Sequence, residues 1–126
     1  MIYRKYPIFP VAIKPLRKHD NLEARITLSC LKYLKMKGYA AGKIKTVGGR
    51  IGNHFIHDPW QWTGVADILL FMPRLVFVEV KAEKGVQSPH QKDFQEFCNK
   101  ARVPYLLVRS LAELQDRIIE LEDKNT

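Results

Sequence analysis

Three charged side chains stand among apolar residues in the middle of the chain: Asp67, Glu79 and Lys81. Asp67 directly precedes the apolar run 68–71, and the other two follow the apolar run 75–78. Both runs are expected to be strands. Because alternate residues of a strand share a face, Glu79 and Lys81 point the same way, about 6–7 Å apart. In this arrangement the carboxylate can hold a cation, and the amine can orient a water molecule.

The connection between the two runs sets their register. If residues 72–74 form a three-residue hairpin loop, Phe71 pairs with Leu75, and Asp67 faces Glu79 with Cβ atoms about 5 Å apart. Facing carboxylates repel each other, and burying them unpaired beside an apolar layer costs free energy. Lys81 supplies one compensating charge, and a divalent cation, which prefers hard oxygen ligands, would supply two.

These carboxylates therefore predict a Mg²⁺ or Mn²⁺ site formed by Asp67, Glu79 and a nearby backbone carbonyl, for which Val80 is the candidate. Such an ion would polarise a phosphate and lower the pKa of its water. Lys81 would then orient that water or neutralise the developing charge. Spacing alone fits an alternative equally well: an ion pair at a solvated strand end, with Asp67 beginning a strand after the turn at Gly64.

The distribution of charge favours a polyanionic partner. The chain has a net charge of +8, but residues 1–57 carry 12 basic and two acidic side chains, and residues 58–126 carry 9 basic and 11 acidic ones. A phosphodiester substrate would explain both this basic half and the carboxylates. Lys43, Lys45 and Arg50 are the candidate phosphate contacts, although they fit plain solvation equally well.

Local signals place these residues on secondary structure. Three prolines predict an irregular basic arm over residues 1–19, and Asp20, with Glu23 three residues later, predicts the start of a helix that ends at Gly38. Ser88, Pro89 and Gln91 mark a second helix start, and a second S-x-x-E box begins at Ser110. The expected strands cover residues 39–47, 65–71, 75–82 and 104–109; the expected helices cover 20–38, 88–101 and 110–121; the expected loop covers 50–64; and the expected flexible tail covers 122–126.

The order α-β-β-β-α-β-α, with strands apolar on both faces, predicts one α/β domain over residues 1–126, a mixed sheet flanked by helices. Cys30 and Cys98 are expected to be buried thiols, because they match no disulfide or metal spacing. No apolar stretch long enough for a membrane span or a signal peptide occurs, which favours a cytoplasmic protein.

The loop 50–64 contains weaker candidates. His54 and His57 are interpreted as loop histidines, because no third ligand completes a zinc site. Trp60 and Trp62 could stack on bases, but packing beneath the loop is the preferred interpretation. His90, outside the loop, is expected to be exposed rather than to touch a phosphate.

These motifs together resemble the VRR-NUC family of the PD-(D/E)XK nuclease superfamily. The resemblance rests on the segment from Gly64 through Asp67, the E-x-K at Glu79 and Lys81, and the S-P-x-Q that ends at Gln91, and it extends over residues 23–110. The chain departs from the family pattern in two places. Ala66 replaces a proline before the acidic residue, and Ala101-Arg102 replaces a glycine after the glutamine helix.

The resemblance implies a PD-(D/E)XK-like core and a metal-dependent phosphodiesterase. Asp67 and Glu79 would bind the metal, Lys81 would assist the attacking water, and Glu23 and Gln91 would complete the site. Both of the latter also fit helix capping alone.

The leading hypothesis is an Mg²⁺- or Mn²⁺-dependent endonuclease that acts on branched DNA, such as a four-way (Holliday) junction. The resemblance also implies a homodimer, since single-domain members of the family resemble junction-resolving enzymes that act as dimers, and two-fold symmetry would let each protomer cut one strand. A domain of this size is also compatible with a phage or mobile-element origin. The alternatives are a restriction or repair nuclease for linear DNA, and a nucleic-acid-binding module without catalysis. Asp67→Ala or Lys81→Ala is expected to abolish cleavage while folding and DNA binding remain.

Overall fold

The computed structural model describes residues 22–44, 49–51, 54–56 and 60–124 of the chain. The elements in this part, in chain order, are α1 (Leu22–Met36), β1 (Ala40–Lys43), β2 (Gly49–Ile51), β3 (His54–Ile56), β4 (Ile68–Phe71), β5 (Leu75–Val80), α2 (Pro89–Lys100), β6 (Tyr105–Val108) and α3 (Leu111–Lys124). The predicted basic arm and Asp20 lie outside the described residues.

A four-stranded mixed sheet forms the centre of the domain. Its strand order is β1-β4-β5-β6, with β1 and β5 antiparallel to β4 and with β6 parallel to β5. The parallel pair requires a crossover, which α2 supplies, whereas the three-residue loop 72–74 joins β4 to β5. This confirms the predicted α/β class and the predicted pairing of Phe71 with Leu75.

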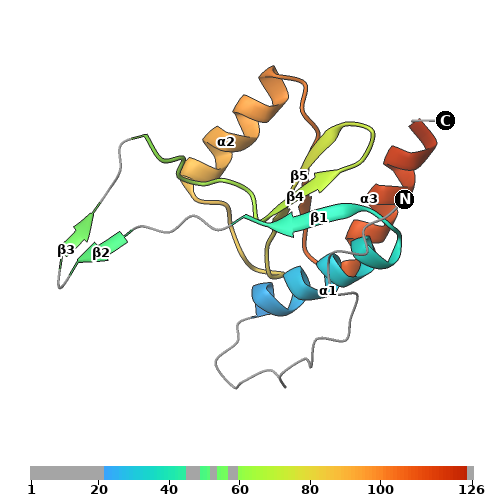
Figure 1. Ribbon diagram of the computed structural model, residues 1–126, viewed down its shortest axis with the longest axis horizontal. Coiled ribbons are helices and arrows are strands. Elements are labelled where there is room, and N and C mark those ends of the chain that lie inside the picture. Colours follow the sequence, from blue (N-terminus) through green and yellow to red (C-terminus); the bar gives the residue numbers. More distant parts are fainter. Residues whose placement is uncertain (1–21, 45–48, 52–53, 57–59, 125–126) are drawn as a thin grey trace.

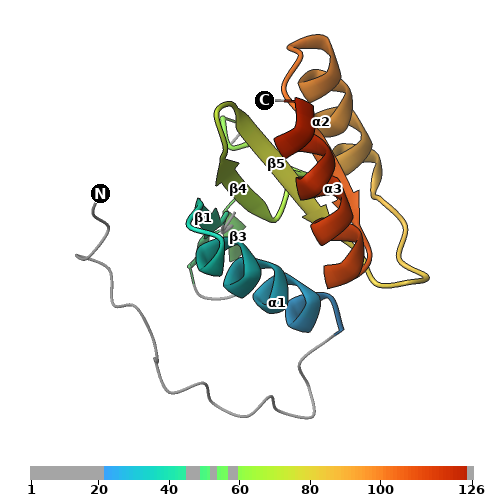
Figure 2. The ribbon, with the colours of Figure 1, turned by 90° about the vertical axis from the view of Figure 1, so that its right-hand side faces the viewer.

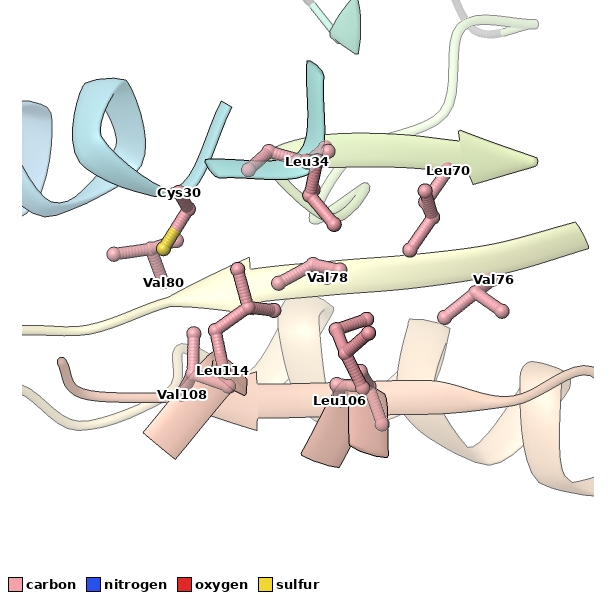
Figure 3. Close-up of a cluster of buried hydrophobic side chains, with 11 residues drawn as sticks. Cys30, Leu34, Leu70, Val76, Val78, Val80, Leu106, Val108 and Leu114 are labelled. Carbon is pink, nitrogen blue, oxygen red and sulfur yellow. The ribbon is translucent and has the colours of Figure 1, made fainter. Parts of the chain in front are cut away.

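Helices cover both faces of this sheet, α2 on one side and α1 with α3 on the other (Figure 1). Figure 2 shows α1 and α3 on the same side of the strands, where they contact each other. The α1–α3 face carries the larger core, formed by even-numbered strand residues such as Val78 and Val80 together with Cys30 and Leu34 of α1 and Leu114 of α3 (Figure 3). The α2 face carries a smaller core, in which Phe94 and Cys98 pack on Ala66 and Tyr105.

The helix ends follow their local signals. α1 ends where Gly38 takes a positive φ of 90°, and its neighbour Tyr39 donates its N–H to the Leu34 carbonyl. Ser88 caps α2 in a complete capping box with Gln91. At the C-terminal end of α2, Arg102 occupies the left-handed region, with φ 58°. A glycine adopts that conformation without steric cost, so Arg102 stands where the backbone favours the missing family glycine.

Three segments differ from the sequence-based expectation. The predicted loop 50–64 contains β2 and β3, an antiparallel pair that lies apart from the main sheet in Figure 1. The first predicted strand is shorter, because it ends at Lys43. The predicted tail is helical as far as Lys124, where Glu122 accepts hydrogen bonds from Lys37 and Tyr39. These contacts tie the end of α3 to the end of α1.

Candidate active site

The carboxylate of Asp67 lies beside that of Glu79, where β4 and β5 leave the core. The β4–β5 register pairs Ile68 with Val78, so one step further places Asp67 opposite Glu79, as predicted. Asp67 Oδ2 accepts a hydrogen bond of 2.7 Å from the Val80 N–H, and the Asp67 carbonyl accepts one from Ile44. Asp67 is therefore held by both neighbouring strands, and its carboxylate takes the place of a backbone partner for β5.

Glu79 is the most deeply buried charged residue among those described, with 1% of its surface exposed. Burial, together with the adjacent Asp67 carboxylate, raises its pKa from 4.5 to about 8. Lys81 and the hydroxyl of Tyr105 oppose this increase in the pKa but do not cancel it. Glu79 thus has too little positive charge around it to be fully ionised at neutral pH.

Lys81 joins the strand to the first turn of α1. Its Nζ lies 3.8 Å from Glu23 Oε1 and 4.0 Å from Glu79 Oε2. The lysine side chain is only 11% exposed, while that of Glu23 is 38% exposed. Glu23 therefore reaches the site, as the family resemblance implied, and the ammonium lies between carboxylates from two elements. The alternative of an ion pair at a solvated strand end does not fit this structure, because Glu79 is inaccessible to solvent.

Gln91, at the start of α2, makes a contact of each kind that the sequence left open: one within the helix cap and one to Glu79. Its Oε1 accepts from the Ser88 N–H at 2.8 Å, which completes the capping box. Its Nε2 donates to Glu79 Oε2 at 3.3 Å. Capping fixes the side chain in place, and the free amide end then orients the carboxylate of Glu79.

Tyr105 is a site residue that sequence reasoning missed. It begins β6, and its hydroxyl donates to Glu79 Oε1 at 3.4 Å and accepts from Gln87 Nε2 at 3.2 Å. Gln87 in turn bonds Gln95 on α2. In the sequence, Tyr105 is indistinguishable from an ordinary core residue of an apolar strand. Only the parallel pairing of β5 with β6 brings it beside the carboxylate.

Arg109 is a second residue that the sequence did not single out. Its guanidinium donates to the carbonyls of Ala82 and Gly85, each at 2.7 Å, and to that of Glu83 at 3.3 Å. These bonds fix the loop that leaves β5 directly after Lys81. Arg109 therefore supports the site through the backbone rather than by contact with the carboxylates.

The predicted phosphate contacts are less defined. Lys43 is exposed at the end of β1, on the strand next to β4. Arg50 belongs to β2, which pairs only with β3, and Lys45 lies outside the described residues. His54 is in β3 rather than in a loop, and His57 lies outside the described residues. His90 is exposed, as expected.

The tryptophans do not pack beneath a loop as expected. Trp60 is 91% exposed and Trp62 is 59% exposed. Trp62 contacts Phe94 and Phe97 of α2 edge-on, so one part of its ring is packed while the rest faces solvent. The preferred interpretation of the sequence was therefore wrong for Trp60 and correct only in part for Trp62.

The donors of this site fit a hydrated divalent cation. In the described part of the chain, no three His, Cys, Asp or Glu side chains form a group that could enclose a metal. Mg²⁺ does not require such a cage, since it keeps several waters and is bound through one or two carboxylates. Asp67 and Glu79 supply two, and a bound cation would favour the ionised form of Glu79, whose pKa burial and Asp67 raise. The carbonyl of Val80 stays a predicted third donor.

Comparison with known proteins supports a nuclease-type domain. No family model and no curated protein matches the chain. A solved structure described as a "VRR_NUC domain" is similar to it, with 27% sequence identity and a TM-score of 0.58. The match covers 78% of this chain and 94% of that one. None of the helices in the described ranges is long and apolar enough to cross a membrane.

Proposed function

We propose that this chain, which belongs to the VRR-NUC family of nuclease domains and has the mixed sheet of a restriction-endonuclease-like core, is a metal-dependent endonuclease that hydrolyses DNA phosphodiester bonds. The observation that carries the proposal is the position of Lys81. Its ammonium lies within 4.0 Å of Glu79 and 3.8 Å of Glu23, beside the carboxylate pair that Glu79 forms with Asp67. A buried acidic pair with one lysine has the composition that hydrolysis of a phosphodiester requires.

Each residue of the site has a distinct part in the proposed reaction. Asp67 and Glu79 would hold a Mg²⁺ or Mn²⁺ ion, which when bound polarises the scissile phosphate and lowers the pKa of water. Lys81 Nζ would orient the attacking water and neutralise charge that develops on the phosphate oxygens. Glu23 positions the ammonium, while Gln91 and Tyr105 position the Glu79 carboxylate.

The proposed substrate is branched DNA, such as a four-way junction, and the proposed active form is a homodimer. A two-fold dimer would present one site to each of two symmetry-related strands. The basic excess of the chain, net +8, supports binding of a polyanion without choosing its shape. Light scattering should give the mass of two chains for the protein alone, and the mass of two chains plus one junction for the complex.

In the decisive experiment, the protein is incubated with a labelled four-way junction or with its component duplexes. Each substrate is tested separately in Mg²⁺, in Mn²⁺ and in EDTA. We expect cleavage only with metal, and faster cleavage of the junction. Lys81→Ala should reduce the rate by about a thousandfold or more while DNA binding remains. Asp67→Asn, which keeps an acceptor for the Val80 N–H, should do the same.

Lys84→Ala is the matched control, because Lys84 is an exposed lysine on the same loop, three residues further along. It should cleave at the wild-type rate. Equal cleavage of junction and duplex would contradict the proposed preference for branched DNA and favour a nuclease that acts on linear DNA. Binding without any metal-dependent cleavage would reduce the protein to a nucleic-acid-binding module.

A further inference from the structure

A hollow lined by aromatic side chains lies between the segment before β4 and helix α2, and it has no part in the proposed hydrolysis. Its volume is about 290 Å³, and its lining includes Trp60, Trp62, His90, Asp93 and Phe97. This volume is close to the lower limit of about 300 Å³ for small-molecule sites, so the hollow suits one small planar group. Trp60, Trp62 and Phe97 are 91%, 59% and 49% exposed, so their rings are available to a ligand.

The hollow has a fixed wall. Gly64 has a φ of 77°, and a Cβ at this position would lie 2.4 Å from the carbonyl carbon of His90. Only glycine permits this approach, which holds the segment before β4 against the first turn of α2. Trp62 then meets Phe94 and Phe97 edge-on, with ring centroids 6.2 and 5.6 Å apart. The site is therefore supported by packing rather than by a loop alone.

The lining selects against a phosphate and for a nucleobase. No lysine or arginine is among the described residues that line the hollow, and Asp93 would repel an anion. An uncharged planar ring could stack on an exposed indole, a contact that every base can make. Asp93 can accept from an exocyclic amine, and His90 can donate to or accept from a ring edge.

Two contacts connect the wall of the hollow to the catalytic site. Gly64 lies against the backbone of His90 and Gln91, and the Gln91 amide donates to Glu79. A nucleotide next to a phosphate held at Lys81 is therefore the proposed occupant. We propose that this hollow binds an unpaired nucleobase of the cleaved strand, an inference that rests on the proposed nuclease function. It would favour substrates with unstacked bases, as occur at a branch point.

Fluorescence tests the inference without catalysis, because Trp60 and Trp62 are the only tryptophans in the chain. The protein in EDTA is titrated with a single-stranded oligonucleotide and with the blunt duplex of the same sequence. We expect strong quenching by the single strand and weak quenching by the duplex. Trp60→Ala should weaken single-strand affinity by about 5- to 100-fold, the range for loss of one stacked base, whereas Trp60→Phe should keep most of it.

Phe71→Ala is the matched control, since Phe71 is an aromatic residue 57% exposed at the opposite end of β4. It should leave the affinity unchanged. Equal affinities of wild type and Trp60→Ala for the single strand, or equal quenching by single strand and duplex, would overturn the inference, even if Lys81→Ala abolishes cleavage. Quenching that depends on Trp60, in a protein that never cleaves, would keep the base site and reject the nuclease function.

Discussion

The two faces of the central sheet differ in composition although they are built from the same strands. Even-numbered residues of β4 and β5, such as Ile68 and Val78, are apolar and buried under α1 and α3. Odd-numbered positions are apolar at one end, as at Phe77, and carry the site residues Asp67, Glu79 and Lys81 at the other. One face is a continuous core, whereas the other is a core at one end and a charged site at the other.

This difference separates stability from chemistry. Burying Glu79 next to Asp67 opposes folding, because the pKa of Glu79 rises when its charged form is disfavoured. The α1–α3 face has no such group among its buried core residues, so burial there stabilises the domain without penalty. Substitutions on the face with the charged site can therefore change its chemistry, while the apolar face keeps the domain folded.

The largest expected effect on stability comes from opening the apolar face. Leu114 of α3 is fully buried, so Leu114→Ala should lower the free energy of unfolding by about 2–5 kcal/mol. Urea denaturation measures this change. Ile119→Ala is the control on the same helix, because Ile119 is 51% exposed and should cost less than about 1 kcal/mol. Equal losses in the two variants would contradict the assignment of this face as the main core.

Replacing Glu79 with a neutral residue tests how the charged site changes the stability of the domain with pH. In the folded, metal-free protein the pKa of Glu79 is about 8, above its ordinary value of 4.5, so the folded state keeps a proton that the unfolded state has lost. Stability is therefore fully present below the ordinary pKa and decreases as the pH rises towards 8, by about 1 kcal/mol per unit. Glu79→Gln removes this titration. Its advantage over wild type, measured by urea denaturation in EDTA, should be greater at about pH 8 than at about pH 5; a constant difference would argue against the raised pKa.

Removing one hydroxyl should weaken the site without removing a ligand. Tyr105→Phe deletes the donor to Glu79 Oε1, and with it one contact that lowers the pKa of Glu79. We expect the Mg²⁺ concentration for half-maximal cleavage to rise by about 10-fold, as is typical when a partner of a metal ligand is lost. Tyr33→Phe serves as the control, because Tyr33 packs on the other face. An unchanged metal requirement would show that Tyr105 only fills space.

The smallest expected effect lies at the end of α2, and it is stabilising. Arg102 holds a φ of 58°, so Arg102→Gly should relieve steric strain and raise the free energy of unfolding by about 1 kcal/mol. The hydrogen bond from Arg74 is kept, since it goes to the Arg102 carbonyl. Thermal denaturation measures the gain, and Arg74→Ala in the Arg102→Gly background separates the two contributions. A loss of stability would mean that the Arg102 side chain contributes more than the strain costs.

Local signals in the sequence predicted much of this architecture. The three-residue loop 72–74 determined the register that places Asp67 opposite Glu79, because residue pairing in a short hairpin follows from loop length. Ser88 and Gln91 predicted the start of α2, because a capping box is a contact within four residues. The capping-box spacing marked Glu23 only as part of a helix start, whereas its place in the site was implied by the family resemblance.

Contacts distant in sequence were the ones that could not be predicted. Tyr105 and Arg109 act on segments more than 20 residues away, and nothing in their immediate neighbours marks them as polar partners. The exposure of Trp60 was also missed, since an aromatic residue near prolines and glycines usually packs. The short strands β2 and β3 lacked a clear alternating pattern, so the turn signals of that region outweighed them.

Because β5 pairs with β6 in parallel, the candidate site is completed late in folding. A β4–β5 hairpin can form early from neighbouring residues, but a parallel strand must wait for its crossover helix and pays more loop-closure entropy. Glu79 acquires its hydroxyl partner only when β6 docks, and Lys81 acquires Glu23 only when α1 packs. A chain still emerging from the ribosome would therefore hold both carboxylates of the candidate site before their partners are in place, so that the proposed nuclease activity would appear only with the complete fold.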